Sequence, residues 1–176
     1  MTQKTARIAL TLLLLGIYST LSVARRITEF IRGAGLLRMM VAGAFVLAAV
    51  AVVTLILKHP GLRRPRVVLM VLIAAALYAA VIWPLSSPEE KLHFLEYGAV
   101  GVLAFLSTPE AWSTPRRFSV AALFTVAAGW LDEGIQALLP NRYYDLRDVG
   151  FNALAGLMAL SVFTLLRAVA LRRAHA

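Results

Sequence analysis

Long apolar runs, separated by short stretches of charged or helix-breaking residues, constrain this chain more than any other feature. A helix rises about 1.5 Å per residue and needs about 20 apolar residues to cross the hydrocarbon core of a bilayer. The chain is 60% hydrophobic and 15% charged, whereas a soluble domain has roughly 25% charged residues. The runs lack the short alternating pattern of an outer-membrane barrel. We therefore expect an all-α, polytopic helical membrane protein.

Six segments are expected to cross the membrane. They are 8–23, 36–57, 67–85, 88–106, 115–139 and 145–169. The first ends in Ser22-Val23-Ala24, which also fits the cleavage site of a signal peptide. We favour an uncleaved first helix and keep the signal peptide as the alternative. Residues 24–35 mix arginines with isoleucine and phenylalanine, which predicts a short amphipathic stretch at the interface.

The basic residues predict the orientation of the chain. The net charge is +9, and the chain has no cysteine for a disulfide or a thiolate metal site. Most Lys and Arg residues lie between apolar runs, which favours retention at the cytoplasmic side over nucleic-acid binding. With the N-terminus inside, the basic residues from 58 onward divide unequally between the two sides. The nine cytoplasmic ones are Lys58, Arg63, Arg64, Arg66, Arg116, Arg117, Arg167, Arg172 and Arg173. The three on the outer side are Lys91, Arg142 and Arg147. The turns at 85–92 and 140–147 should therefore face the extracytoplasmic side.

Polar residues gather near the ends of the last three expected helices. His93, Glu96 and Tyr97 follow the spacing i, i+3 and i+4, so they share one helix face. Glu133 and Gln136, preceded by Asp132, interrupt the apolar end of the next segment. Up-and-down connectivity places the start of the segment at 88–106 and the end of the segment at 115–139 on the same membrane side. We expect the two groups to lie at a similar depth.

The last segment adds a stripe of polar residues at its start. Asp145, Asp148 and Asn152 lie at i, i+3 and i+7, and Gly156 continues the stripe where a neighbouring helix could approach closely. Asp145 and Asp148 could equally cap the helix and complement its dipole. Ionisable groups inside a membrane are costly, so they should face one another or a wet pocket. We expect Glu133 to lie near Asp148 or Asn152.

These residues form one candidate site. Its ligand-binding candidates are Lys91, His93, Glu96, Tyr97, Glu133, Gln136, Arg142, Asp145, Asp148 and Asn152. Lys91, His93 and Arg142 could hold a phosphate through charge-assisted hydrogen bonds. Glu133, Asp148 and His93 are the candidates for acid–base catalysis, although the sequence assigns no reaction and leaves open whether the protein is an enzyme.

Three other functions compete with ligand binding. A divalent-metal site on His93, Glu96, Glu133, Asp145 and Asp148 is disfavoured because no spacing within one helix demands it, and we expect no metal and no cofactor. A proton-coupled transporter is disfavoured because 100–106 and 157–166 contain no charge. A non-catalytic scaffold for another membrane protein stays open.

The composite pattern resembles the VanZ-like family. The matching elements are Lys91-x-His93 and Tyr97, Glu133-x-x-Gln136, Pro140-x-Arg142-x-x-Asp145-x-x-Asp148, and Asn152 with Gly156. The resemblance covers about 67–170 and implies a four-helix membrane domain there, preceded by two added spans at 1–66 and followed by a basic tail at 171–176. It also implies a multi-pass protein of the bacterial cytoplasmic membrane.

The family's founding member is associated with low-level teicoplanin resistance, so the resemblance implies a link to glycopeptide resistance. The expected function is binding of an anionic or lipid-linked cell-envelope molecule at the extracytoplasmic face. The expected partners are membrane lipids and such a precursor, with no nucleic acid. The oligomeric state is left open.

Overall fold

Helices make up all the regular structure of the described residues. The computed structural model describes the backbone of residues 1–140 and 144–171, with the side chains of that part except 24–29, 89 and 171. The elements are α1 (Gln3–Gly33), α2 (Leu37–Lys58), the 3-10 helix η1 (Pro60–Arg63), α3 (Pro65–Ile82), α4 (Pro88–Ser107), α5 (Thr114–Ala137) and α6 (Leu146–Leu171). The expected all-α class is confirmed.

Five helices are long and apolar enough to cross a membrane. The qualifying segments are Gln3–Val23, Leu37–Lys58, Pro65–Ile82, Thr114–Ala137 and Leu146–Ala170. They correspond to five of the six expected segments, and their ends differ by a few residues. The protein is thus a multi-pass helical membrane protein.

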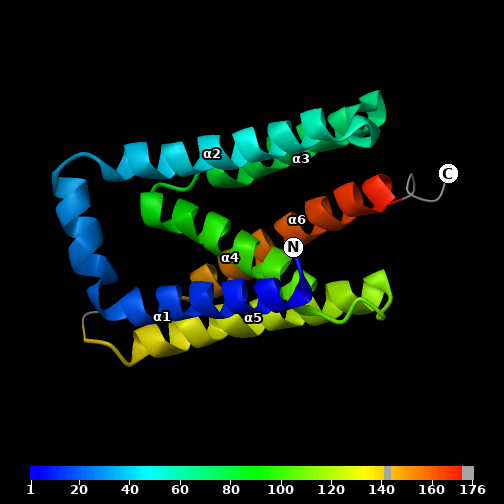
Figure 1. The fold of residues 1–176 in the computed structure, drawn as a ribbon. Helices are drawn as coiled ribbons and strands as arrows, with labels where there is room; N and C mark the ends of the chain where they lie inside the picture. The colour runs from blue at the N-terminus through cyan, green and yellow to red at the C-terminus, as the bar shows by residue number, and fades with distance from the viewer. Residues whose placement is uncertain (141–143, 172–176) are drawn as a thin grey trace.

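The remaining helix, α4, has 20 residues, and its first turns are rich in charged residues. Its sequence contains Glu89, Glu90, Lys91 and Glu96, yet it contacts α1, α2, α5 and α6 and so runs through the middle of the bundle (Figure 1). Its buried side chains are Phe94, Tyr97, Val100, Ala104 and Phe105. A helix that begins with charged residues is therefore enclosed mainly by α1, α5 and α6.

The helices run up and down, which gives the bundle two different ends (Figure 1). The polar end holds the first turns of α4, the last turns of α5 and the first turns of α6. The basic end holds η1 and the turn between α4 and α5. The expected placement of the three polar groups on one side is confirmed.

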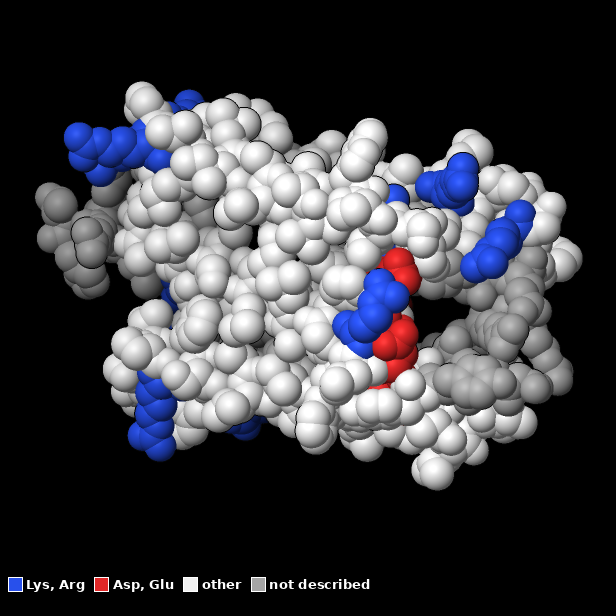
Figure 2. All heavy atoms as spheres, turned by 180° about the vertical axis from the view of Figure 1, so that it is seen from behind, with Lys and Arg blue, Asp and Glu red and all other residues white. Residues whose placement is uncertain are grey.

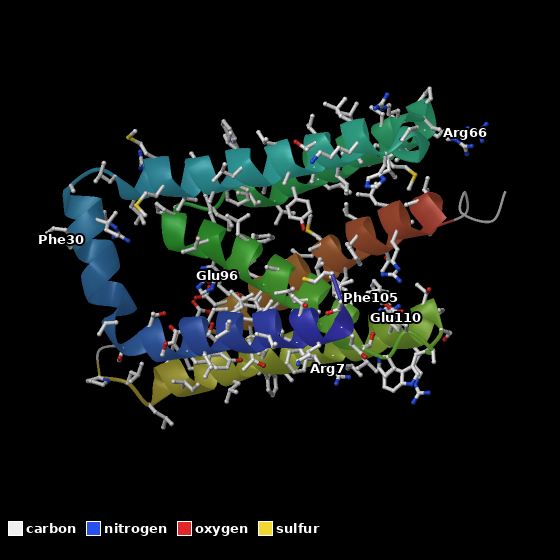
Figure 3. All side chains as sticks on the ribbon, viewed as in Figure 1. Arg7, Phe30, Arg66, Glu96, Phe105 and Glu110 are labelled. Atoms are coloured by element: carbon white, nitrogen blue, oxygen red, sulfur yellow. The ribbon has the colours of Figure 1, made fainter. Side chains whose placement is uncertain are left out.

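α1 combines the expected first span and the stretch that follows it in one helix. It is one helix of 31 residues, but it turns sharply so that its last part lies across the polar end (Figure 1). Its first part buries Ala6, Leu10 and Ile17 against α4 and α5. Phe30, 80% exposed, projects away from the bundle (Figure 3). In the packing, α1 contacts α4 and α5, whereas α3 contacts α6 and η1. The domain boundary at residue 66 stays a prediction.

Side chains from two helices cap the last turn of α4 at the basic end. Gln3 Nε2 and Arg7 Nε donate to the Ser107 carbonyl at 3.0 and 3.2 Å. Arg117, only 4% exposed, donates from Nη2 to the Phe105 carbonyl at 3.2 Å and from Nε to Thr108 Oγ1 at 2.9 Å. Cations at a helix C-terminus satisfy its free carbonyls and complement its dipole. Arg117 therefore contributes to packing as well as to the basic charge of this end.

Two glycines allow α5 and α6 to approach closely near the polar end. A Cβ atom added at Gly156 would lie 2.4 Å from Thr125 Cγ2. One added at Gly129 would lie 2.9 Å from the Cβ of Asn152. Real Cβ atoms do not approach other atoms this closely, so both positions exclude larger residues unless a neighbour moves. The close approach expected at Gly156 is confirmed.

Candidate functional site

Asp132 forms the centre of a buried hydrogen-bond network at the polar end. It is 0% exposed, and its Oδ2 accepts from the Tyr97 hydroxyl of α4 at 2.7 Å. Its Oδ1 accepts from Gln136 Nε2 at 3.2 Å, one turn further along α5. The same Nε2 donates to Glu133 Oε1 at 2.9 Å. One amide group thus bridges two carboxyl groups inside the membrane, where unpaired polar groups are costly.

Glu133 connects this network to the start of α6. It is 1% exposed, and its Oε2 accepts from the backbone N–H of Asp145 at 3.1 Å. Asp145 in turn caps α6, because its Oδ1 accepts from the backbone N–H of Arg147 at 2.8 Å. Glu133 also lies close enough to Asp148 and His93 for electrostatic interaction. The expected meeting of Glu133 with the α6 stripe is confirmed, with the backbone of Asp145 as the direct partner.

His93 completes the α4 side of the cluster. Its Nδ1 lies 3.6 Å from Glu96 Oε2, and its ring centroid is 6.2 Å from that of Tyr97, so the three share a face as expected. Nδ1 is buried and has no hydrogen-bond partner among the described residues. This nitrogen therefore retains unused hydrogen-bonding capacity.

Asn152 is the second buried group with unused hydrogen-bonding capacity. The residue is 0% exposed, and neither Oδ1 nor Nδ2 finds a partner in the described part of the chain. It packs against Gly129, where an added Cβ would also lie 3.5 Å from Tyr97 Cε1. A buried amide without partners costs about 1–3 kcal/mol, and such groups in native proteins call for an explanation. Asn152 and His93 are the two places where the cluster is incomplete.

The structure brings together most of the expected site residues. Glu96, Tyr97, Glu133, Gln136, Asp145, Asp148 and Asn152 all lie at the polar end with His93. Lys91 is half-buried in the first turn of α4, whereas Arg142 lies outside the described residues.

Sequence reasoning gave Asp132 no ligand role and overlooked Tyr18. Asp132 precedes Gln136 by one helical turn, and that spacing could have identified it. The Tyr18 hydroxyl of α1 donates to the Ala128 carbonyl at 3.0 Å, close to the Tyr97 hydroxyl, which lies 3.4 Å from the same carbonyl. Nothing in the sequence indicated that α1 would pack there.

Acidic and amide groups occupy the interior of the cluster, and cations flank it. Arg147 is exposed, with its guanidinium 5.8 Å from the ring centroid of Phe151. Figure 2 shows the acidic side chains of one face gathered at a single place beside a basic one, with an uncharged belt toward the other end. The interior can therefore accept hydrogen bonds from hydroxyl or amine groups, and the flanking cations can pair with an anion.

Within the described residues, no group of three or more His, Asp or Glu side chains is arranged to hold a metal ion. The cluster is suited to hydrogen bonding and ion pairing. Comparison of the chain with models of protein families, with curated proteins and with solved structures gives no match.

Proposed function

We propose that this is a VanZ-like protein of a bacterial cytoplasmic membrane that binds an anionic or lipid-linked cell-envelope molecule at its polar end. One observation carries the proposal: His93 and Asn152 retain unused hydrogen-bonding atoms beside a network drawn from α4, α5 and α6. A link to glycopeptide resistance rests on the family resemblance.

The chemistry of the cluster suits a ligand that carries both phosphate and hydroxyl groups. Carboxyl and amide oxygens accept from hydroxyl groups, as sugar hydroxyls would offer, while Lys91, Arg142 and Arg147 supply cations for phosphate. A lipid-linked precursor presents both kinds of group near the membrane surface, beside its hydrocarbon chain. Glu133, Asp148 and His93 remain candidates for proton transfer if the ligand is also a substrate.

A membrane scaffold is the second candidate function, and a specific observation favours it. Asp132 and Glu133 already use their oxygens within the protein, on Tyr97, Gln136 and the backbone of Asp145. Such a network can simply hold three helices together. The two functions make different demands on the basic residues. Binding of an anionic ligand requires cations such as Lys91, Arg142 and Arg147, whereas a scaffold does not.

The orientation of the polar end can be measured with single cysteines, because the chain has none of its own. Ser86 and Ser113 are suitable sites, since both are exposed and they lie at opposite ends of α4. We expect Ser86→Cys to react with an impermeant maleimide in intact cells, and Ser113→Cys to react only after permeabilisation, because of the basic bias described above. The reverse pattern would place the polar end in the cytoplasm, and labelling of both from one side would exclude α4 as a span.

Arg142→Ala tests ligand binding. We expect the variant to fold normally but to retain an anionic phospholipid at least tenfold less tightly, because a charge-assisted hydrogen bond contributes about 1.5–3 kcal/mol. Arg142→Lys should recover part of the affinity, since lysine keeps the charge but lacks the planar fork. Native mass spectrometry of lipid adducts, with thermal stability measured alongside, provides the readout.

Arg116→Ala is the matched control, because Arg116 is an exposed arginine at the basic end, stacked 4.0 Å from the Trp112 ring centroid. It should leave adducts at the polar end unchanged. Equal adducts on wild type and Arg142→Ala would contradict the binding proposal and favour the scaffold.

A further inference from the structure

A lipid-facing groove lies between α3 and α6, on a part of the molecule that the polar site does not use. Its volume is about 410 Å³. Met70, Ala74 and Tyr78 line it from α3, and Leu157, Ser161 and Leu165 line it from α6. The lining residues run from Met70 to Tyr78 on α3 and from Leu157 to Leu165 on α6, about 12 Å along each helix. The groove thus follows the long axis of the bundle.

The groove lies between two places where α3 packs against the bundle. Toward the polar end, Tyr78, Val81 and Ile82 pack against the main hydrophobic core. Leu62 of η1, Val67 of α3 and Leu166 of α6 form a small buried cluster at the basic end. Beyond this cluster α3 makes few contacts with α6, and its side chains are largely exposed. The cluster closes the groove at the basic end.

Charge distinguishes that end of the groove. Between Glu29 and Glu89 the sequence contains no acidic residue. Arg63 is engaged in capping α2, because its guanidinium donates to the Leu57 carbonyl. Arg64 and Arg66 are exposed, and Arg66 lies one turn from Met70 on the same stripe of α3. Figure 3 shows Arg66 at the end of the molecule opposite Glu96. An apolar groove therefore ends beside cations that have no acidic neighbour in the sequence.

We propose that the groove binds one hydrocarbon chain of an anionic phospholipid, whose phosphate lies against Arg64 and Arg66. The apolar walls suit a hydrocarbon chain, and the cations suit a negatively charged headgroup at the same membrane surface. The exposed cations Arg64 and Arg66 beyond one end of the groove favour an anionic lipid over an uncharged helix face as the occupant. This lipid site is independent of the polar end and of Arg142.

The chain part of the site can be tested by filling the groove. Ala74→Phe places a ring among the lining residues, whereas Ala75→Phe adds the same ring at the next position, which is exposed and does not line the groove. Wild type and both variants would be purified as the full chain, delipidated, and titrated with phosphatidylglycerol or phosphatidylcholine under native mass spectrometry. We expect Ala74→Phe to lose the tightest phosphatidylglycerol adduct and Ala75→Phe to keep it. Ser161→Phe fills the groove from α6 and should reproduce the loss if Ala74→Phe fails to fold.

The headgroup part has its own pair of variants. Arg64→Gln/Arg66→Gln should weaken phosphatidylglycerol binding about 30-fold, given the usual attraction of each basic residue near an anionic surface. Phosphatidylcholine binding should stay unchanged. Lys4→Gln/Arg116→Gln removes two exposed charges from the same end and should have little effect.

Three results would overturn the proposal. They are equal phosphatidylglycerol retention by Ala74→Phe and Ala75→Phe, equal retention of the two lipids by wild type, and a dimer that Ala74→Phe alone dissociates. The last would assign the groove to a second copy of the chain.

Discussion

Replacing Asp132 with alanine is expected to lower the free energy of unfolding by about 2–3 kcal/mol. The substitution removes the short acceptor of the Tyr97 hydroxyl and one of the two acceptors of Gln136. The buried Tyr97 hydroxyl then has only the Ala128 carbonyl, at 3.4 Å, which is a weak hydrogen bond. Asp132→Asn should cost less, because its carbonyl oxygen still accepts from Tyr97. The free energies of unfolding of wild type, Asp132→Ala and Asp132→Asn would be measured by titration with a denaturing detergent.

A double-mutant cycle isolates the bond between α4 and α5. Combining Asp132→Ala with Tyr97→Phe should reveal a coupling energy of about 1 kcal/mol, within the range of interhelical hydrogen bonds measured in membranes. Glu110→Ala removes an exposed carboxylate at the basic end and should change stability by less than about 0.5 kcal/mol. If Asp132→Ala were as mild as Glu110→Ala, Asp132 would not be the centre of the network.

Gly156→Ala is expected to destabilise the protein by about 1–3 kcal/mol through overpacking. The new methyl group would meet Thr125 Cγ2 at 2.4 Å, so α5 and α6 must separate or Thr125 must change rotamer. Thr125→Ser removes that methyl group and keeps a hydroxyl that can bond the Ala121 carbonyl, now 2.8 Å away. The double variant should therefore recover most of the lost stability in the same detergent titration.

Gly150→Ala serves as the control for the effect of alanine itself, because an added Cβ at Gly150 meets nothing within 4 Å. Because alanine has a higher helix propensity than glycine, Gly150→Ala should leave the stability unchanged or raise it slightly. Equal effects of Gly150→Ala and Gly156→Ala, or no recovery by Thr125→Ser, would mean that the close approach of α5 and α6 tolerates the extra methyl group.

Local chemistry in the sequence predicted the fold well. Pro88 at the first position of α4 and Asp145 before α6 gave the helix starts that the structure has, because proline and aspartate favour those positions for local reasons. The polar groups also fell on one side because short turns force alternate helices to reverse direction. Both conclusions depend on neighbours in the chain.

Partners across helices were harder to predict. The periodicity of α5 placed Asp132, Glu133 and Gln136 near its end but did not fix the rotation of the helix. The pairing of Asp132 with Tyr97, and of Glu133 with the backbone of Asp145, depends on that rotation. The packing of α1 against α4 and α5 joins residues more than 100 positions apart, as Tyr18 and Ala128 show. A single sequence contains no local signal for such contacts.

The polarity of α4 has a consequence for how the chain enters the membrane during synthesis. A segment with four charged residues is a weak signal for the insertion machinery, because each charge near the middle of a helix opposes integration by about 2.5–3.5 kcal/mol and less near its ends. The partners that shield α4 come from both directions along the chain: α1 is synthesised before it, and α5 and α6 after it. Gln3, Arg7 and Arg117 all bond the last turns of α4, so the helix gains its full set of partners only when translation has passed it. We therefore expect stable integration of α4 to be a late event in the biogenesis of the protein, completed when its neighbours have been made.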